Sequence, residues 1–198
     1  SKEKIIKLSK IMIHDVKISP LKIISDDRGK VMHMLRSDNS IFKKFGEIYF
    51  SCTNPNAVKA WHLHKKMTLN YAVVSGAIKC VLYDDRSESK TKGQIEEYFM
   101  SPENYYLLTV PPLIWNGWKS IGNNVSIVAN CSDIPHDPEE MLRKPFDDPK
   151  LYDVVIKKSP IHGRGVFTKK DINKDELILP YNYKPENIMG WLDFKAKY

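Results

Sequence analysis

The stretch Val58–Gly76 reads VKAWHLHKKMTLNYAVVSG and determines the fold and function that we expect for this chain. It holds two histidines, His62 and His64, and ends in a strand-like apolar run closed by Gly76. Alternate residues of a strand point to the same face, so both imidazoles are predicted to share a face with Ala60. The intervening residues are expected on the opposite face: Lys59, Trp61 and Leu63. If the histidine face lines a β-barrel, two polar rings lie in a cavity, where they need partners or a function.

Short strand-like runs follow one another along the chain, with turn residues between them. Besides the histidine strand, the predicted strands are Val16–Ile24, Lys30–Leu35, Gly46–Cys52, Leu69–Val74, Ala77–Tyr83, Ile95–Met100, Tyr105–Val110 and Val125–Cys131. Asp26–Gly29, with the sequence DDRG, is typical of a tight turn. Ala77–Tyr83 is expected to pair back on the preceding strand after Gly76. Short strands at such regular spacing predict an all-β antiparallel sandwich or barrel.

Composition narrows the class of protein. The 198 residues are 42% hydrophobic and 28% charged, which fits a globular domain with a core. No apolar run approaches the roughly 20 residues of a membrane-spanning helix. The three cysteines are widely spaced and form no disulfide framework. We therefore expect a cytoplasmic protein that has no membrane partner.

The net charge of +7 is concentrated at the two ends of the chain. Residues 1–10 hold four Lys and one Glu, and residues 154–198 hold nine Lys or Arg and five Asp or Glu. Residues 11–153 hold eighteen of each sign and are neutral. Nucleic-acid binding needs a basic patch on the folded body, so we expect no nucleic-acid partner.

Seven short motifs occur in a fixed order along the central part of the chain. They are Asp27-Arg28-Gly29, Lys59-Ala60-Trp61-His62, Val73-Val74-Ser75-Gly76 with Asp84-Asp85-Arg86, Ser89–Gly93, Ser101–Asn104, Val110-Pro111 with Asn116-Gly117-Trp118, and Phe146–Pro149. Together they resemble the dTDP-4-dehydrorhamnose 3,5-epimerase family, whose members act on nucleotide-linked 4-keto sugars. The resemblance covers roughly residues 13–153. It implies a cupin-type antiparallel jelly-roll barrel, a nucleotide-diphosphate sugar as substrate, and a homodimer.

The resemblance, together with the chemistry of proton removal beside a ketone, predicts roles for individual residues. His62 is expected as the base that removes a proton beside the ketone, with Asp148 or Asp84 orienting its imidazole. His64 is expected as a proton shuttle or as a structural neighbour. The expected substrate-binding residues are Arg28, Lys59, Lys65, Lys66, Asn116 and Trp118, of which Arg28 and Lys59 hold the diphosphate. Solvated surface lysines are the simpler interpretation of Lys65 and Lys66, and a core aromatic is the simpler interpretation of Trp118.

Several positions depart from the family pattern. The tyrosine that serves as general acid in the family is absent, and its position falls near Ala129. Asn116 stands in place of the family's second active-site histidine, and Leu69 or a neighbour stands in place of a family lysine. The returning proton is then expected from another donor: Tyr71, Tyr49, His64 or water. Two alternatives therefore stay open. One is a keto-isomerase of nucleotide sugars, whose RGxHAHK-like stretch is similar to WHLHKK, and the other is an inactive sugar-nucleotide-binding module.

A metal-binding cupin is a further alternative, because His62 and His64 match the HxH part of its pattern. Thr68 or Leu69 stands in place of its glutamate, and Asn116 stands in place of its last histidine. Two ligands do not hold a catalytic metal. We therefore expect no metal and no other cofactor.

The C-terminal part has a resemblance of its own. The run VVIKKSPIHGRGVFTKKDINKDELI, with the turn Gly163-Arg164-Gly165, resembles the opening of SET-type methyltransferase domains. About forty residues cannot supply a complete domain of that kind, so we expect a small β-clip-like extension without methyltransferase activity. The predicted organisation is a basic lead over residues 1–12, a cupin domain over 13–153 and this extension over 154–198.

Overall fold

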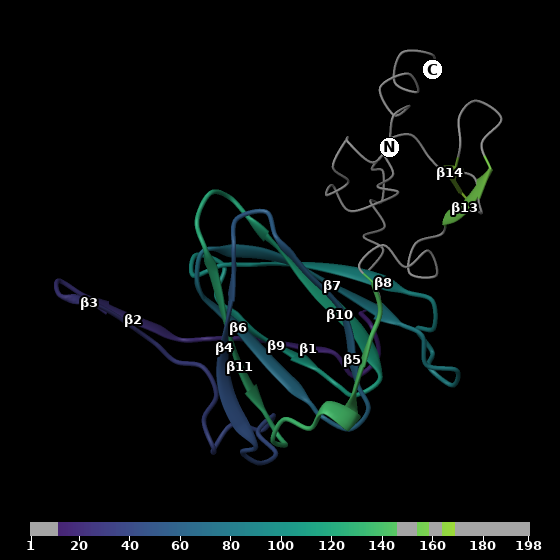
Figure 1. Ribbon diagram of the computed structural model, residues 1–198. Coiled ribbons are helices and arrows are strands. Elements are labelled where there is room, and N and C mark those ends of the chain that lie inside the picture. The colour runs from purple at the N-terminus through teal and green to yellow at the C-terminus, as the bar shows by residue number, and fades with distance from the viewer. Residues whose placement is uncertain (1–11, 146–153, 159–163, 169–198) are drawn as a thin grey trace, which may run out of the picture. The chain divides into compact units, whose positions relative to one another are not determined.

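Two five-stranded antiparallel sheets form the larger part of the protein. The computed structural model describes residues 12–145, 154–158 and 164–168, and it divides into the units Ser1–Lys144 and Pro145–Tyr198. The first sheet has the order β1-β9-β6-β11-β4, and the second has the order β12-β5-β10-β7-β8. Figure 1 shows the two sheets facing each other around a common interior. The predicted all-β antiparallel fold is confirmed.

The strands are short, as the sequence predicts. The first sheet contains β1 (Lys17–Pro20), β4 (Glu47–Thr53), β6 (Leu69–Ser75), β9 (Tyr106–Val110) and β11 (Ser126–Ser132). The second contains β5 (Val58–His64), β7 (Ala77–Asp84), β8 (Ile95–Met100), β10 (Ile114–Ile121) and β12 (Met141–Arg143). A short 3-10 helix, η1 (Pro138–Glu140), precedes β12. None of the described residues belongs to a helix long and apolar enough to cross a membrane.

The core lies between the two sheets. Along β7 every second residue is buried, so Ile78, Cys80 and Leu82 point inward. They pack in one cluster with side chains of the other sheet, including the fully buried Leu108 and Val128. Removal of this apolar surface from water is the main favourable term in folding.

The chain crosses from one sheet to the other at Gly76, which the sequence did not predict. β6 pairs with β9 and β11, whereas β7 pairs with β10 and β8, so the expected hairpin of β6 with β7 is wrong. Gly76 has a φ of +67°, and a Cβ there would lie 2.7 Å from Ser126 Oγ. Only glycine fits a left-handed position against a neighbouring strand in this way, and it lets the chain change sheets.

β10 is a central strand that periodicity missed. Its middle, Trp115-Asn116-Gly117-Trp118, holds no β-branched residue and includes a glycine, which weakens a strand pattern. The glycine has a packing reason, because a Cβ on Gly117 would lie 2.4 Å from the Cβ of Ala60 in β5. β10 and β5 therefore approach closely enough only with glycine at this position.

A β-bulge in β5 changes which side chains face inward. Asn116 pairs with His62 and Trp118 pairs with Lys59, so β5 has one more residue than β10 between these pairs. Directly opposed residues share a face, and an extra residue reverses the alternation. Lys59 thus lies on the same side as His62, although strict alternation predicted the opposite face.

The predicted strand Val16–Ile24 is two strands with different partners. β1 pairs with β9 in the first sheet, while β2 (Ile23–Asp26) forms a separate hairpin with β3 (Gly29–Met32). The predicted turn Asp26–Gly29 is confirmed, with the Arg28 N–H donating to Asp26 Oδ1 over 2.9 Å. Figure 1 shows this hairpin projecting away from the two sheets.

In the second unit, the described residues form one antiparallel pair of strands. β13 (Val154–Lys158) pairs with β14 (Arg164–Thr168) in the register Val154 to Thr168. Most of the predicted β-clip-like extension, including the turn before Arg164, lies outside the described residues.

Candidate functional site

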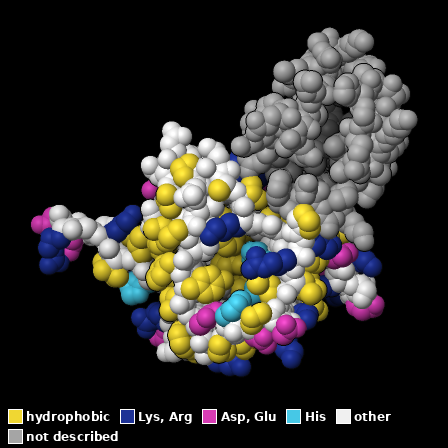
Figure 2. All heavy atoms as spheres, in the orientation of Figure 1, with side chains coloured by type: hydrophobic (Ala, Val, Ile, Leu, Met, Phe, Trp, Pro, Cys, Tyr) yellow, Lys and Arg dark blue, Asp and Glu magenta, His cyan; other side chains and the backbone are white. Residues whose placement is uncertain are grey.

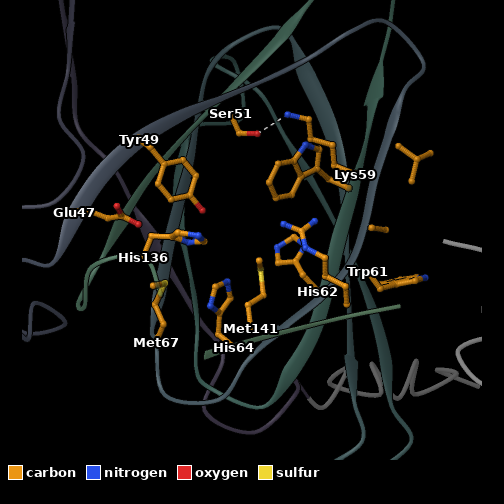
Figure 3. A pocket seen from close by; sticks show the side chains of 14 residues that line it. Glu47, Tyr49, Ser51, Lys59, Trp61, His62, His64, Met67, His136 and Met141 are labelled. Atoms are coloured by element: carbon orange, nitrogen blue, oxygen red, sulfur yellow. Dashed lines mark hydrogen bonds between the residues drawn. The ribbon is translucent and has the colours of Figure 1, made fainter. Parts of the chain in front are cut away.

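A cavity of about 800 Å³ opens between β4 of the first sheet and β5 with β12 of the second. Figure 2 shows a hollow on this face, lined by hydrophobic side chains, with Lys, Arg and His side chains around it. Figure 3 shows the side chains that project into the cavity from the two walls. One wall is rich in histidine, and the other wall carries a tyrosine.

Both histidines of the HxH motif lie on the cavity wall formed by β5. His62 and His64 line the cavity, and their ring centroids are 5.9 Å apart in an edge-to-face arrangement. The predicted shared face is therefore confirmed. Within the described residues no group of three or more His, Cys, Asp or Glu side chains is arranged to hold a metal ion.

His62 is held from behind by a chain of hydrogen bonds. The Asn116 amide donates to the backbone carbonyls of His62 and Ile114, over 3.1 and 3.2 Å, so its Oδ1 is free to accept. The Tyr71 hydroxyl donates to that Oδ1 over 3.1 Å, and the same hydroxyl oxygen lies 3.3 Å from His62 Nε2. A hydroxyl has one proton to give, so Tyr71 accepts from His62 and Nε2 carries the hydrogen. The free lone pair of the imidazole is then on Nδ1.

Burial keeps the His62 ring neutral. Loss of solvent, followed by the charges of His64 and Arg143, lowers the pKa of His62 to about 3. An imidazole with this pKa is unprotonated near neutral pH, so its lone pair is unoccupied, while the same burial makes it a weaker base than a solvated histidine. Tyr71 behind it stays protonated, because burial raises its pKa well above the usual value.

His64 has a different partner, the buried carboxylate of Glu140. The distance from His64 Nδ1 to Glu140 Oε2 is 2.6 Å, and the two side chains are 6% and 4% exposed. The other oxygen of Glu140 accepts the backbone N–H groups of Lys66 and Met67, which fixes the turn after β5. Burial tends to raise the pKa of Glu140, but these hydrogen bonds and His64 lower it overall, so the carboxylate is ionised. Nδ1 of His64 therefore carries a proton, and Nε2 is the nitrogen left for other partners.

Sequence reasoning missed Glu140, which lies 76 residues from His64 along the chain. The local signal was present, because Asp137 caps the 3-10 helix by accepting from the Glu139 N–H, with Pro138 in its first turn. That signal predicts a turn and not a partner. The partner follows from β12, which pairs Met141 with His64 and so brings η1 to the end of the histidine strand.

The facing wall of the cavity is formed by β4. Glu47, Tyr49 and Ser51 alternate along this strand and point into the cavity (Figure 3). Burial raises the pKa of Tyr49, with a smaller lowering from Asn130, so its hydroxyl is protonated near neutral pH. Tyr49 is thus a proton donor on the wall opposite the histidines.

Residue 129, where the family has its tyrosine, is an alanine and cannot supply that proton. Ala129 pairs with Phe50 of β4, whose side chain is 61% exposed. Directly opposed residues share a face, and Phe50 alternates with the inward-facing Tyr49. Residue 129 therefore points away from the cavity, and the hydroxyl comes from the neighbouring strand.

Two cations also line the cavity. Lys59 reaches across it and donates to Ser51 Oγ over 2.9 Å, which Figure 3 marks as a dashed line. Arg143 pairs in register with His62 from β12. Neither cation takes part in an ion pair among the described residues.

Asp84 does not orient His62, contrary to expectation. Its carboxylate is fully buried elsewhere, and it accepts from Arg86, Ser89 and Thr91. The alternative carboxylate, Asp148, lies outside the described residues. The described hydrogen-bond partner of the His62 ring is a tyrosine.

Several expected substrate-binding residues do not line the cavity. Arg28 is on the β2–β3 hairpin, where its side chain is 85% exposed and paired with Asp26. Lys65 donates to the Glu139 carbonyl, and the Lys66 side chain is also outside the lining. Asn116 is buried behind His62, where it binds Tyr71.

Trp118 combines the two roles that were considered for it. It belongs to the buried core, where its Nε1 donates to Thr53 Oγ1 over 3.0 Å. It also lines the cavity, with its ring centroid 5.9 Å from that of His62. The tryptophan is therefore a rigid part of the cavity wall.

Known proteins of one family are similar to this chain. A model of the dTDP-4-dehydrorhamnose 3,5-epimerase family matches residues 10–177. The chain is 32% identical over 139 residues to the spore coat polysaccharide biosynthesis protein SpsL of Bacillus subtilis (strain 168), covering 69% of this chain and 92% of that protein. It is 33% identical over 139 residues to the probable low-salt glycan biosynthesis epimerase Agl13 of Haloferax volcanii, covering 68% and 89%.

Solved structures show the same fold. A dTDP sugar isomerase from Desulfovibrio desulfuricans G20 is 44% identical, with a TM-score of 0.69 over 70% of this chain and 89% of that one. The enzyme RmlC of Legionella pneumophila, solved with dTDP-4-keto-L-rhamnose, is 22% identical with a TM-score of 0.65 over 71% and 78%. The predicted cupin jelly roll is thereby confirmed. The chain belongs to the dTDP-4-dehydrorhamnose 3,5-epimerase family.

Proposed function

We propose that this chain inverts a carbon next to the ketone of a nucleotide-linked 4-keto-6-deoxy sugar, with His62 as base and Tyr49 as acid. The observation that carries the proposal is the pairing of a neutral imidazole and a protonated phenol on facing walls of one cavity. Membership of an epimerase family supports the reaction class. The names of the two relatives support a role in making a surface polysaccharide or glycan.

The chemistry needs two groups on opposite faces of the sugar ring. His62 removes the proton from the carbon beside the ketone, and the C–H electron pair moves toward the carbonyl to give an enolate. Tyr49 then returns a proton to that carbon from the other face, which inverts its configuration. His62 afterwards releases its proton, and Tyr49 regains one, by exchange with water.

The two cations of the cavity suit the diphosphate of the substrate. Lys59 and Arg143 lie on neighbouring strands of the histidine wall. Arginine binds phosphate oxygens through a planar fork, whereas lysine acts as a point charge. We assign the diphosphate to these two residues, and Trp118 to an apolar face of the sugar or base.

The homodimer is part of the proposal, and β4 supports it. This edge strand turns polar residues into the cavity, while its outward residues Ile48 and Phe50 are 51% and 61% exposed. An edge strand with an apolar outer face is a site for association. A second copy covering this face would also give the exposed Arg28 hairpin a surface to contact. Light scattering at micromolar concentration should give the dimer mass, and a monomer mass would contradict the dimer.

A keto-isomerase is the second candidate, and one observation favours it. His62 and His64 lie on the same wall, so they can move protons between neighbouring carbons on one face of the sugar. In that reaction the carbonyl changes position and no configuration has to be inverted by the opposite wall.

Incubation in deuterated water with a panel of nucleotide 4-keto sugars tests the function. An epimerase incorporates deuterium at the carbon beside the ketone and inverts it, whereas an isomerase moves the carbonyl. Binding without exchange would indicate an inactive binding module. A panel that neither exchanges nor binds would refute the proposed site.

Tyr49→Phe separates the acid from the base. The variant should lower formation of the inverted product by about 100-fold, because the opposite-face donor is lost. Deuterium exchange with retention of configuration should persist, since His62 can return the proton it removed. Tyr83→Phe, at an exposed hydroxyl that contacts Asp85, is the matched control. Equal loss of exchange and inversion in Tyr49→Phe would contradict the assignment.

A further inference from the structure

His64 and Glu140 form a polar pair that the proposed base and acid leave unused. Both side chains are buried, yet His64 lines the same cavity as His62. Glu140 comes from η1, outside the HxH motif, and its side chain turns inward to reach His64. A buried carboxylate costs free energy unless its partners compensate it. We therefore ask what Glu140 does for His64.

The bonds of Glu140 divide cleanly between its two oxygens. Oε1 accepts both backbone N–H groups of the turn, from Lys66 and Met67, and Oε2 accepts only from His64 Nδ1. The first oxygen therefore stabilises the turn. The second fixes the ring of His64 and leaves Nε2 as the nitrogen that can exchange a proton in the cavity. Glu140 also places a negative charge beside the ring, with Oε2 2.6 Å from Nδ1.

His64 is placed beside His62 in the way that ketone chemistry requires. Removal of a proton from carbon puts negative charge on the ketone oxygen, which is two bonds away. A proton donor at that oxygen lowers the barrier because it acts where charge develops. Adjacent inward positions on one strand, with ring centroids 5.9 Å apart, let one ring face the carbon and the other face the oxygen.

We propose that His64, oriented by Glu140, donates a proton from Nε2 to the ketone oxygen while His62 removes the proton from carbon. The inference rests on the proposed function. The C–H pair becomes the second bond between the two carbons, and the π pair of the ketone forms the new O–H bond. His62 ends with one more proton and His64 with one fewer, so the enol is neutral. When Tyr49 returns a proton to carbon, His64 takes back the proton on oxygen.

The other charged groups around the cavity are less suited to this role. Lys59 is bonded to Ser51 on the facing wall. Arg143 has a guanidinium that holds its protons too tightly to transfer one. Glu47 lies on the facing wall, on β4. His136 is exposed and has no carboxylate partner among the described ion pairs.

Glu140→Gln tests the pair because it can keep the hydrogen bonds to the turn and change only the hydrogen bond to His64. The amide oxygen can still accept from Lys66 and Met67, but the amide NH₂ now faces His64 Nδ1 and donates to it. The ring is then fixed as the neutral Nε2–H form and cannot carry a second proton. Glu139→Gln, on the exposed neighbour in the same 3-10 helix, is the matched control.

The experiment measures deuterium exchange and ring nitrogen NMR on the same proteins. We expect wild type and Glu139→Gln to show a proton on His64 Nδ1 and equal kcat. Glu140→Gln should lose that Nδ1 proton and lower kcat by about 100-fold, with KM within about threefold. His64→Asn, whose amide can still donate to Glu140, should lower kcat equally. It replaces Glu140→Gln in the test if that variant does not fold.

The outcomes separate this inference from the function on which it rests. If wild type exchanges deuterium and both Glu140→Gln and His64→Asn keep its kcat, the role of His64 is refuted and the epimerase stands. A wild-type spectrum without a proton on His64 Nδ1 refutes it as well. If wild type exchanges none of the 4-keto sugars, the proposed function fails and the inference fails with it.

Discussion

The cavity and the network around Asp84 are both built from carboxylates and polar partners, but they differ in what their bonds leave free. Asp84 accepts from Arg86, Ser89 and Thr91, and Arg86 also donates to the His14 carbonyl. These bonds hold the pKa of Asp84 below its usual range, even though burial acts to raise it. Both carboxylate oxygens of Asp84 accept hydrogen bonds, and Arg86 links the end of β7 to the N-terminal segment through the His14 carbonyl.

The cavity leaves reactive groups free. After their structural bonds are counted, His62 keeps a lone pair, His64 keeps Nε2 and Tyr49 keeps a proton to give. A fully satisfied network stabilises the fold, whereas a partly satisfied one at a cavity is available for chemistry. Two polar clusters that each hold a buried carboxylate are thus distinguished by their remaining hydrogen-bond capacity. The following predictions test that distinction, beginning with the largest effect.

His62→Asn should reduce deuterium exchange by about 1,000-fold, because the proposed general base is lost. The asparagine amide takes the place of Nδ1 and does not reach Tyr71, so stability near neutral pH should fall by about 1 kcal/mol. Exchange into the sugar, followed by NMR, measures the rate. His14→Asn, at an exposed histidine, is the control, and retention of even a tenth of the exchange by His62→Asn would remove it as the base.

Asp84→Asn should have the opposite profile. It removes a buried charge that Arg86 needs, which should lower the free energy of unfolding by about 3 kcal/mol. The rate per folded molecule should stay at the wild-type value, because Asp84 does not reach the cavity. Denaturant unfolding and exchange rates measure the two quantities, with Asp85→Asn as the exposed neighbouring control. A loss of rate without a loss of stability would show that Asp84 acts at the site after all.

Acid should act on the two clusters in different pH windows. The pKa of His62 falls from its unfolded value near 6.5 to about 3 in the folded protein, so only the unfolded state takes its proton between these values. Stability contributed by neutral His62 is therefore present above about pH 6.5 and lost as the pH falls. The lowered pKa of Asp84 gives stability that is present above about pH 4 and lost below it.

The comparison of wild type with His62→Asn isolates the first window. Between pH 7 and pH 5 wild type should lose about 1–2 kcal/mol more than the variant. Urea unfolding at both pH values measures the difference. Parallel loss in the two proteins would mean that His62 is not held neutral by burial.

Lys65→Ala and Lys66→Ala should have the smallest effect. Their side chains lie outside the cavity lining, so KM should stay close to the wild-type value. The free energy of unfolding should stay within about 0.5 kcal/mol of wild type. Lys59→Ala and Arg143→Ala provide the contrast and should raise KM by about tenfold or more. A comparable rise in KM for Lys65→Ala would place the diphosphate near the β5–β6 turn.

The sequence by itself determined the all-β class, the Asp26–Gly29 turn, the shared face of His62 and His64, and the family. These features depend on local period, turn chemistry and the order of short motifs, which are readable from neighbouring residues. The same periodicity could not locate β10, because Gly117 is present for a close contact with another strand and not for its own strand propensity.

Only the tertiary structure decided which strands share a sheet and which side chains share a site. The bulge that turns Lys59 inward is a matter of register between β5 and β10. Glu140 reaches His64 across 76 residues, and Tyr49 supplies a hydroxyl from the strand beside Ala129. Such contacts join residues far apart in the chain, and they are selected by the packing of two sheets rather than by local sequence. The pairing partners, and with them the chemistry of the cavity, therefore follow from the folded arrangement.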